Sequence, residues 1–74
     1  MKTAMASRFS QVLKRHRLAA GLTQAELAKR AGLAKGTVSD LEQGRVEPAW
    51  SSVIALAKAL QIRTDDLVGD EEDE

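Results

Sequence analysis

The sequence has no cysteine, one proline and two aromatic residues, Phe9 and Trp50, and each scarcity excludes a class of protein. Without cysteine the chain has no disulfide, no thiolate metal ligand and no cysteine nucleophile, which fits a reducing cytoplasm. Two aromatic side chains offer little surface on which single-stranded bases could stack. The apolar runs are short, and the N-terminus lacks the apolar segment of a secretory signal. We therefore expect a cytoplasmic protein without a membrane span.

Patterns for catalysis and metal binding are missing as well. His16 is the only histidine and has no paired nucleophile, so we expect it to pack at the edge of the core. The acidic residues concentrate at the C-terminal end, where a flexible segment cannot preorganise a site. Metal-ligand spacing and a glycine-rich phosphate loop are both absent from the sequence. These features predict a protein that is not an enzyme and has no cofactor or metal.

Charge is distributed unevenly along the chain, although the formal net charge is zero. Residues 1–64 hold all eleven Lys and Arg residues and only four acidic residues, a balance of +7. Residues 65–74 hold the other seven acidic residues and no basic residue, a balance of −7. A basic body favours a polyanionic partner. The alternative is that 30% charged residues is ordinary for a small soluble domain.

Helical periodicity dominates the sequence, because β-branched residues are few and no alternating run is long enough for a strand. A chain of 74 residues makes one small domain. We predict a compact all-α domain of five short helices over 7–69. A flexible N-terminus (1–6) precedes it, and a disordered acidic tail (70–74) follows it.

The first predicted helix extends from a cap at Ser7 to about Ala20, and Gly21 ends it. Residues spaced three or four apart form a stripe along one face, which we expect to face inward. The stripe consists of Phe9, Val12, Leu13, His16 and Arg17.

The second predicted helix, Gln24–Ala31, begins with a capping box formed by Thr23 and Glu26. Gly32 follows it and allows the positive φ that a tight turn needs. Two helices joined by such a short turn cross steeply, so we expect Ala28 to be small because the backbones approach closely there. These features indicate a helical corner, and alone they say nothing about DNA.

Three further helices are predicted. One covers roughly Lys35–Gln43 and stops at Gly44, one covers about Ala49–Gln61 with Pro48 marking its start, and a last short turn is capped by Thr64. We expect their inward positions among Val38, Leu41, Trp50, Val53, Ile54, Leu56, Ala57, Leu60, Leu67 and Val68.

Several motifs with fixed spacing coincide with a known pattern. They are LTQAELA at 22–28, Gly32, TVSDLEQG at 37–44, Pro48 and LAKAL at 56–60. Over most of the chain they resemble the lambda-repressor-like helix-turn-helix domain, the Cro and XRE class of small DNA-binding regulators. The resemblance implies the five-helix fold of that class and double-stranded DNA as the partner.

In this class the second helix crosses the sugar-phosphate backbone and the third, here within 34–43, enters the major groove. The resemblance implies that Gln24 and Arg45 contact phosphates. The free N–H groups at the start of a helix would favour the same anion beside Gln24. It also implies that Lys35, Gly36 and Asp40 face the bases. Thr37 and Ser39 would lie nearer the DNA backbone.

The individual contacts have alternatives. Lys35 could donate to guanine O6 and N7, or it is an ordinary surface lysine. Asp40 could accept a hydrogen bond from cytosine N4. The alternative for Gln24 is a solvated residue that makes no contact with DNA. Gly36 either lets the backbone approach a base pair closely or marks weak recognition at that position. Four basic residues would add to the positive field without an assigned contact: Arg8, Lys14, Lys29 and Arg30.

The resemblance also implies a partly buried ion pair between Arg17 and Glu42, which makes Arg17 structural; its alternative is a phosphate contact. Two positions depart from the family pattern. Ala34 stands where a Ser or Thr usually caps the recognition helix, which costs about 0.5–2 kcal/mol. Gln61 replaces a glycine that often follows the fourth helix.

Members of the class bind as two-fold dimers to half-sites about one helical turn apart. We therefore expect a homodimer on a palindromic operator. The interface candidates are Trp50, Ile62, Leu67 and Val68, although Trp50 could instead be a core residue. The acidic tail could aid solubility, mimic DNA or bind a protein partner. The expected function is a sequence-specific transcriptional regulator, most simply a repressor or controller protein. The alternative is an antitoxin-like interaction partner with the same fold.

Overall fold

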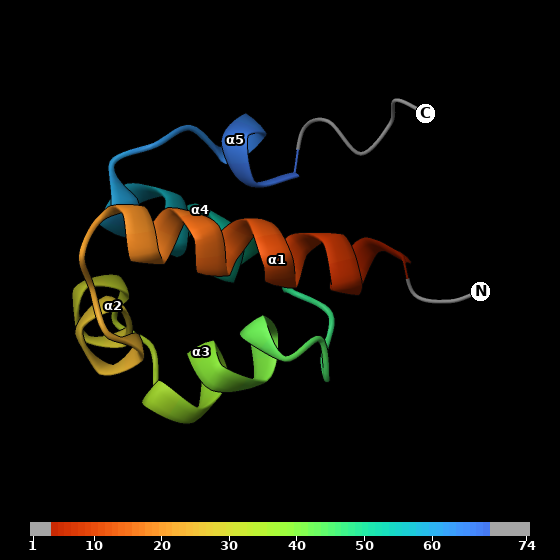
Figure 1. Cartoon of the computed structure of the whole chain (residues 1–74), viewed down its shortest axis with the longest axis horizontal. Coiled ribbons are helices and arrows are strands. Elements are labelled where there is room, and N and C mark those ends of the chain that lie inside the picture. The colour runs from red at the N-terminus through yellow and green to blue at the C-terminus, as the bar shows by residue number, and fades with distance from the viewer. Residues whose placement is uncertain (1–3, 69–74) are drawn as a thin grey trace.

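The computed structural model describes residues 4–68, which form five α-helices and, within that range, no strand (Figure 1). The helices are α1 (Ala4–Ala19), α2 (Gln24–Ala31), α3 (Lys35–Glu42), α4 (Trp50–Leu60) and α5 (Thr64–Val68). The predicted all-α, five-helix architecture is confirmed. Residues 1–3 and the tail at 70–74 lie outside the described residues, so the predictions for these segments stay predictions.

Helix α1 begins three residues earlier than predicted. It starts at Ala4, so the proposed cap at Ser7 is wrong, and so is the assignment of residues 4–6 to a loose terminus. The reason is intrinsic propensity, because alanine and methionine at 4–6 are strong helix formers that need no cap at Ser7. The far end is as predicted: Gly21 has φ +74, and the amide of Leu22 donates to the carbonyl of Arg17 at 3.1 Å.

Helix α2 and the turn after it match the predicted corner. The Thr23 hydroxyl accepts from the Glu26 amide at 3.0 Å, and the Glu26 carboxylate accepts from the Thr23 amide at 2.9 Å. Gly32 closes the helix at φ +72, and the amide of Leu33 donates to the carbonyl of Ala28 at 2.9 Å. The capping box at one end and the glycine turn at the other fix both ends of this short helix.

The ends of α4 and α5 lie close to the predicted positions. Helix α4 begins at Trp50, two residues after Pro48, and Ala49 occupies its cap position. Thr64 is the first residue of α5, not its cap; instead the Arg63 amide donates to the Asp66 carboxylate at 3.0 Å. Gln61, which replaces the usual glycine, adopts the left-handed conformation at φ +59. The backbone there keeps the geometry that glycine would take more easily.

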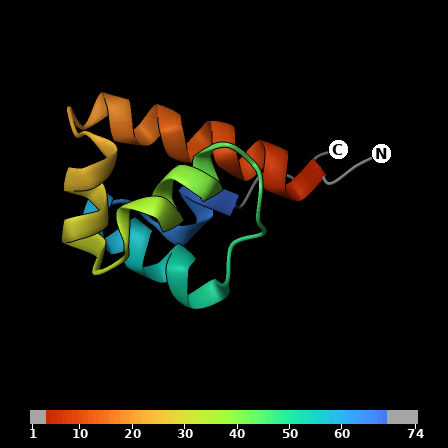
Figure 2. The same ribbon diagram turned by 90° about the horizontal axis from the view of Figure 1, so that it is seen from below.

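The core lies where the five helices meet. Helix α2 packs against α3 and α4, while α5 packs against α4 and α1. Helices α3 and α5 lie on opposite sides of the layer made by α1 and α4 (Figure 1 and Figure 2). The buried apolar residues are Phe9, Leu13, Leu22, Leu27, Ala28, Val38, Leu41, Val53, Leu56, Ala57, Leu60 and Leu67. Among the helices within 4–68, none is both long and apolar enough to cross a bilayer.

Candidate nucleic-acid interface

One face of α3 packs against the core, and the opposite face is exposed. Val38 and Leu41 are buried in the core, as predicted. Lys35 and Gly36, in the first turn, are exposed, and Figure 2 shows α3 lying across the side of the molecule opposite α5. Thr37 is half-buried. The first turn of α3 is thus accessible to a ligand that approaches from this side.

Gly36 has no structural reason to be glycine within the protomer. Its φ is not positive, and a Cβ built on it would meet no atom within 4 Å. The N-terminus of α3 is also weakly capped, because Ala34 holds the cap position with no side-chain hydrogen bond. Both departures from good helix design sit at the exposed end of α3.

The polar residues of α3 make contacts that the sequence analysis missed. Asp40 faces Arg45 at 3.8 Å, and the Ser39 hydroxyl accepts from Gln43 Nε2 at 2.8 Å. Gln43 directly follows α3 and comes four residues after Ser39, a spacing that could have predicted their bond. Since 66% of the Arg45 side chain and 44% of the Asp40 side chain are exposed, their ion pair contributes only about 0–1 kcal/mol and is easily exchanged for another partner.

The predicted ion pair between Arg17 and Glu42 is present and buried. Arg17 Nε donates to Glu42 Oε2 at 2.6 Å, and Nη2 donates to Oε1 at 3.0 Å. Nη1 donates to the carbonyl of Leu22 at 2.8 Å. The hydrogen bond to Glu42, aided by its charge and opposed by burial, raises the pKa of Arg17 above its ordinary value. Because three guanidinium nitrogens are engaged inside the protein, the alternative that Arg17 contacts phosphate is not supported.

Gln24, the predicted phosphate contact, is half-buried at the start of α2. Its Nε2 donates to Glu42 Oε1 at 3.0 Å. No local signal predicts this bond, because the two residues are 18 positions apart. Gln24 therefore belongs to the same polar cluster as the buried ion pair.

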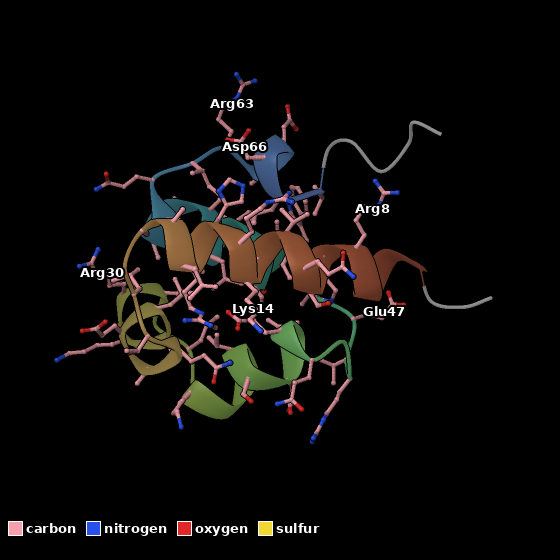
Figure 3. All side chains as sticks on the ribbon, in the orientation of Figure 1. Arg8, Lys14, Arg30, Glu47, Arg63 and Asp66 are labelled. Carbon is pink, nitrogen blue, oxygen red and sulfur yellow. The ribbon has the colours of Figure 1, made fainter. Side chains whose placement is uncertain are left out.

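Arg8, Lys14 and Arg30, to which no particular DNA contact is assigned, lie on different sides of the molecule (Figure 3). In Figure 3, Lys14 lies on the side of α1 that faces α3. Arg8 projects on the side of α5, and Arg30 leaves the α2 end of the molecule. Of these three, Lys14 is the one on the side of α1 that faces α3.

The predicted interface residues separate into exposed and buried ones. Trp50 is 58% exposed, so the alternative that it is a core residue is wrong. Leu67 is buried where α5 folds back on α1 and α4, which makes its assignment to an interface wrong. Ile62 and Val68 are half-buried against the core. Ile54, one helical turn after Trp50 and 36% exposed, was missed.

His16 is half-buried on α1, at the edge of the core as predicted. Across the part of the chain that the structure describes, no three His, Cys, Asp or Glu side chains are grouped so that they could hold a metal ion.

Known proteins resemble this chain in sequence and fold. A family model described as a helix-turn-helix domain matches residues 8–69. The immunity repressor protein of Bacillus phage phi105 is 40% identical over 50 residues, which are 68% of this chain but only 35% of the repressor. An HTH-type transcriptional regulator of Methanothermobacter thermautotrophicus, itself uncharacterized, is 41% identical over 49 residues, 66% of this chain and 71% of that protein. The restriction-modification controller protein C.AhdI from Aeromonas hydrophila superposes with a TM-score of 0.85 at 34% identity, covering 88% of this chain and 98% of its own.

Proposed function

Because the chain belongs to the Cro and XRE class of helix-turn-helix domains, we propose that it is a transcriptional regulator that binds double-stranded DNA with α3 in the major groove. The observation that carries this proposal is the division of α3 between a buried face and an exposed first turn. A recognition helix enters the groove with its N-terminal residues foremost, which suits this division. The names of the relatives favour a repressor or controller protein. We assign this protein to the cytoplasm.

Base contacts select a sequence, whereas phosphate contacts fix the position of the domain. We assign Lys35 to guanine and Asp40 to cytosine N4. Arg45, 3.8 Å from Asp40, offsets the repulsion between the Asp40 carboxylate and the DNA phosphates. Arg45 also binds one of these phosphates. Gln24 binds another phosphate at the start of α2. The other α3 residues on this surface are Gly36, Thr37 and Ser39.

Two copies are expected to bind a palindromic operator, since one domain covers too few base pairs to be selective. The exposed Trp50 and Ile54 on α4 suit contact between the copies, and Ile62 and Val68, half-buried against the core, stay candidates. An exposed tryptophan beside an exposed isoleucine is costly unless a partner covers it.

The test is selection of bound duplexes from a random pool, followed by fluorescence anisotropy on the selected and a scrambled duplex. We expect the selected sequence to be palindromic and to bind more tightly than the scrambled one. Its affinity should fall by roughly 10³–10⁵-fold between 50 and 200 mM salt, if about 6–10 phosphates are contacted. Equal affinity for both duplexes, or no binding at low salt, contradicts the proposal.

An antitoxin-like interaction protein is the second candidate, which the exposed Trp50 and Ile54 also favour. This alternative predicts DNA binding only when a second, copurified protein is present. Binding of the isolated chain to a selected duplex argues against it.

A further inference from the structure

The carboxylate of Glu42 connects the buried ion pair to the predicted DNA-binding surface. Its side chain is 2% exposed and comes from the last residue of α3. Oε2 accepts from Arg17 Nε at 2.6 Å, while Oε1 accepts from both Arg17 Nη2 and Gln24 Nε2 at 3.0 Å. One carboxylate thus joins α1, the start of α2 and the end of α3.

Glu42 cannot turn away from Gln24 without losing its bonds to Arg17. The guanidinium engages both carboxylate oxygens and is itself anchored to the Leu22 carbonyl at 2.8 Å. Such paired, charge-assisted bonds define an orientation more strictly than single neutral ones. The acceptor offered to Gln24 is therefore fixed in space before any ligand arrives.

The amide nitrogen of Gln24 has two N–H groups, and a single bond to Glu42 uses one of them. Gln24 is the first residue of α2, where the backbone N–H groups of the first turn also favour an anion. A glutamine side chain loses rotamer freedom when it binds a ligand. The bond to Glu42 restricts that freedom when the protein folds, so less is lost when DNA binds.

We propose that Glu42 is a positioning residue for DNA binding, which holds the Gln24 amide so that its second N–H donates to a phosphate. This inference rests on the proposed function and deepens it. Glu42 touches no DNA, and its effect on affinity passes through Gln24. The guanidinium of Arg17, 2.6 Å away, offsets the negative charge of the carboxylate, which would otherwise repel the phosphate.

The test compares four proteins on the selected duplex: the unchanged chain, Gln24→Ala, Glu42→Gln and the double variant. All are measured by anisotropy at a temperature where circular dichroism shows each to be folded. We expect Gln24→Ala to weaken binding about tenfold, as for a lost hydrogen bond to a charged group. Glu42→Gln should weaken binding of the unchanged chain but leave the affinity of Gln24→Ala unaltered. Gln11→Ala, at an exposed position on α1, is the control and should bind normally.

Two independent losses that multiply in the double variant would overturn the inference, as would a Glu42→Gln variant with full affinity. If Glu42→Gln does not fold, side-chain amide NMR of the unchanged protein decides. The Gln24 amide should be as ordered as the backbone, in contrast to Gln11; equal disorder of the two would overturn the inference. Failure of the unchanged chain to bind any duplex refutes the proposed function itself, whereas these outcomes in a chain that binds DNA refute only the role of Glu42.

Discussion

Gly36 is the residue whose identity conflicts most clearly with its surroundings. Glycine disfavours helix by about 0.8–1 kcal/mol relative to alanine. Its backbone does not need glycine, and nothing in the protomer occupies the space beside it. The space beside Gly36 is on the exposed first turn of α3, where the proposed function places a base pair.

Gly36→Ala should therefore raise the free energy of unfolding by about 0.5–1 kcal/mol, measured by urea denaturation. The same variant separates the two interpretations of this position. Weaker binding to the selected duplex identifies a close approach of the backbone to DNA, and unchanged binding identifies weak recognition there. A less stable variant would contradict the absence of atoms around the added methyl group.

The two helices of the corner differ at their N-termini. Thr23 and Glu26 form a complete capping box on α2, whereas Ala34 on α3 has an extended backbone suited to a cap but no side-chain bond. The proposed recognition helix is thus less strongly anchored at its first turn than the helix that supports it.

Ala34→Ser should stabilise the protein by about 0.5–2 kcal/mol, because the hydroxyl can accept a hydrogen bond from a free amide of the first turn. Thermal unfolding measures the change. Thr23→Ala is the matched control and should lower stability by a similar amount. If Ala34→Ser has no effect while Thr23→Ala destabilises, the first turn of α3 does not form the cap geometry described.

Helix α3 is also the element at which sequence preference should be decided. Lys35→Ala should reduce discrimination between the selected duplex and one altered at the contacted base pair by about 1–3 kcal/mol. Gln24→Ala should weaken both duplexes alike, since a phosphate contact carries no sequence information. Arg63→Ala removes one positive charge on the side of α5, opposite α3, and is the control for charge alone (Figure 3). An unaltered preference in Lys35→Ala would refute the base contact.

At the scale of the whole molecule, the exposed apolar residues of α4 set the expectation for assembly. Trp50→Ser combined with Ile54→Ser should shift a dimer toward monomer in sedimentation velocity, with little loss of stability because both side chains are exposed. Leu18→Ser is a matched control, since Leu18 on α1 is 58% exposed, the same fraction as Trp50. A dimer that persists in the double variant would locate the interface elsewhere.

Motif spacing located the chain in its family and implied the ion pair of Arg17 with Glu42, although the two residues are distant in the chain. Motif spacing did not predict the contacts that are specific to this chain. The bond between Gln24 and Glu42 depends on how the core places α2 relative to α3. The ion pair between Asp40 and Arg45 depends on the path of the loop after α3.

The sequence by itself determined the number and order of the helices, the capping box at Thr23, the glycine turns at Gly21 and Gly32, and the inward face of α3. These features depend on backbone conformation and hydrogen bonds within one or two turns, so nearby residues suffice to specify them. Only the tertiary structure decided that Leu67 is buried and Trp50 exposed. Helix α4 has more apolar residues than its neighbours can cover, so the packing of α2 and α5 against it decides which of them are buried.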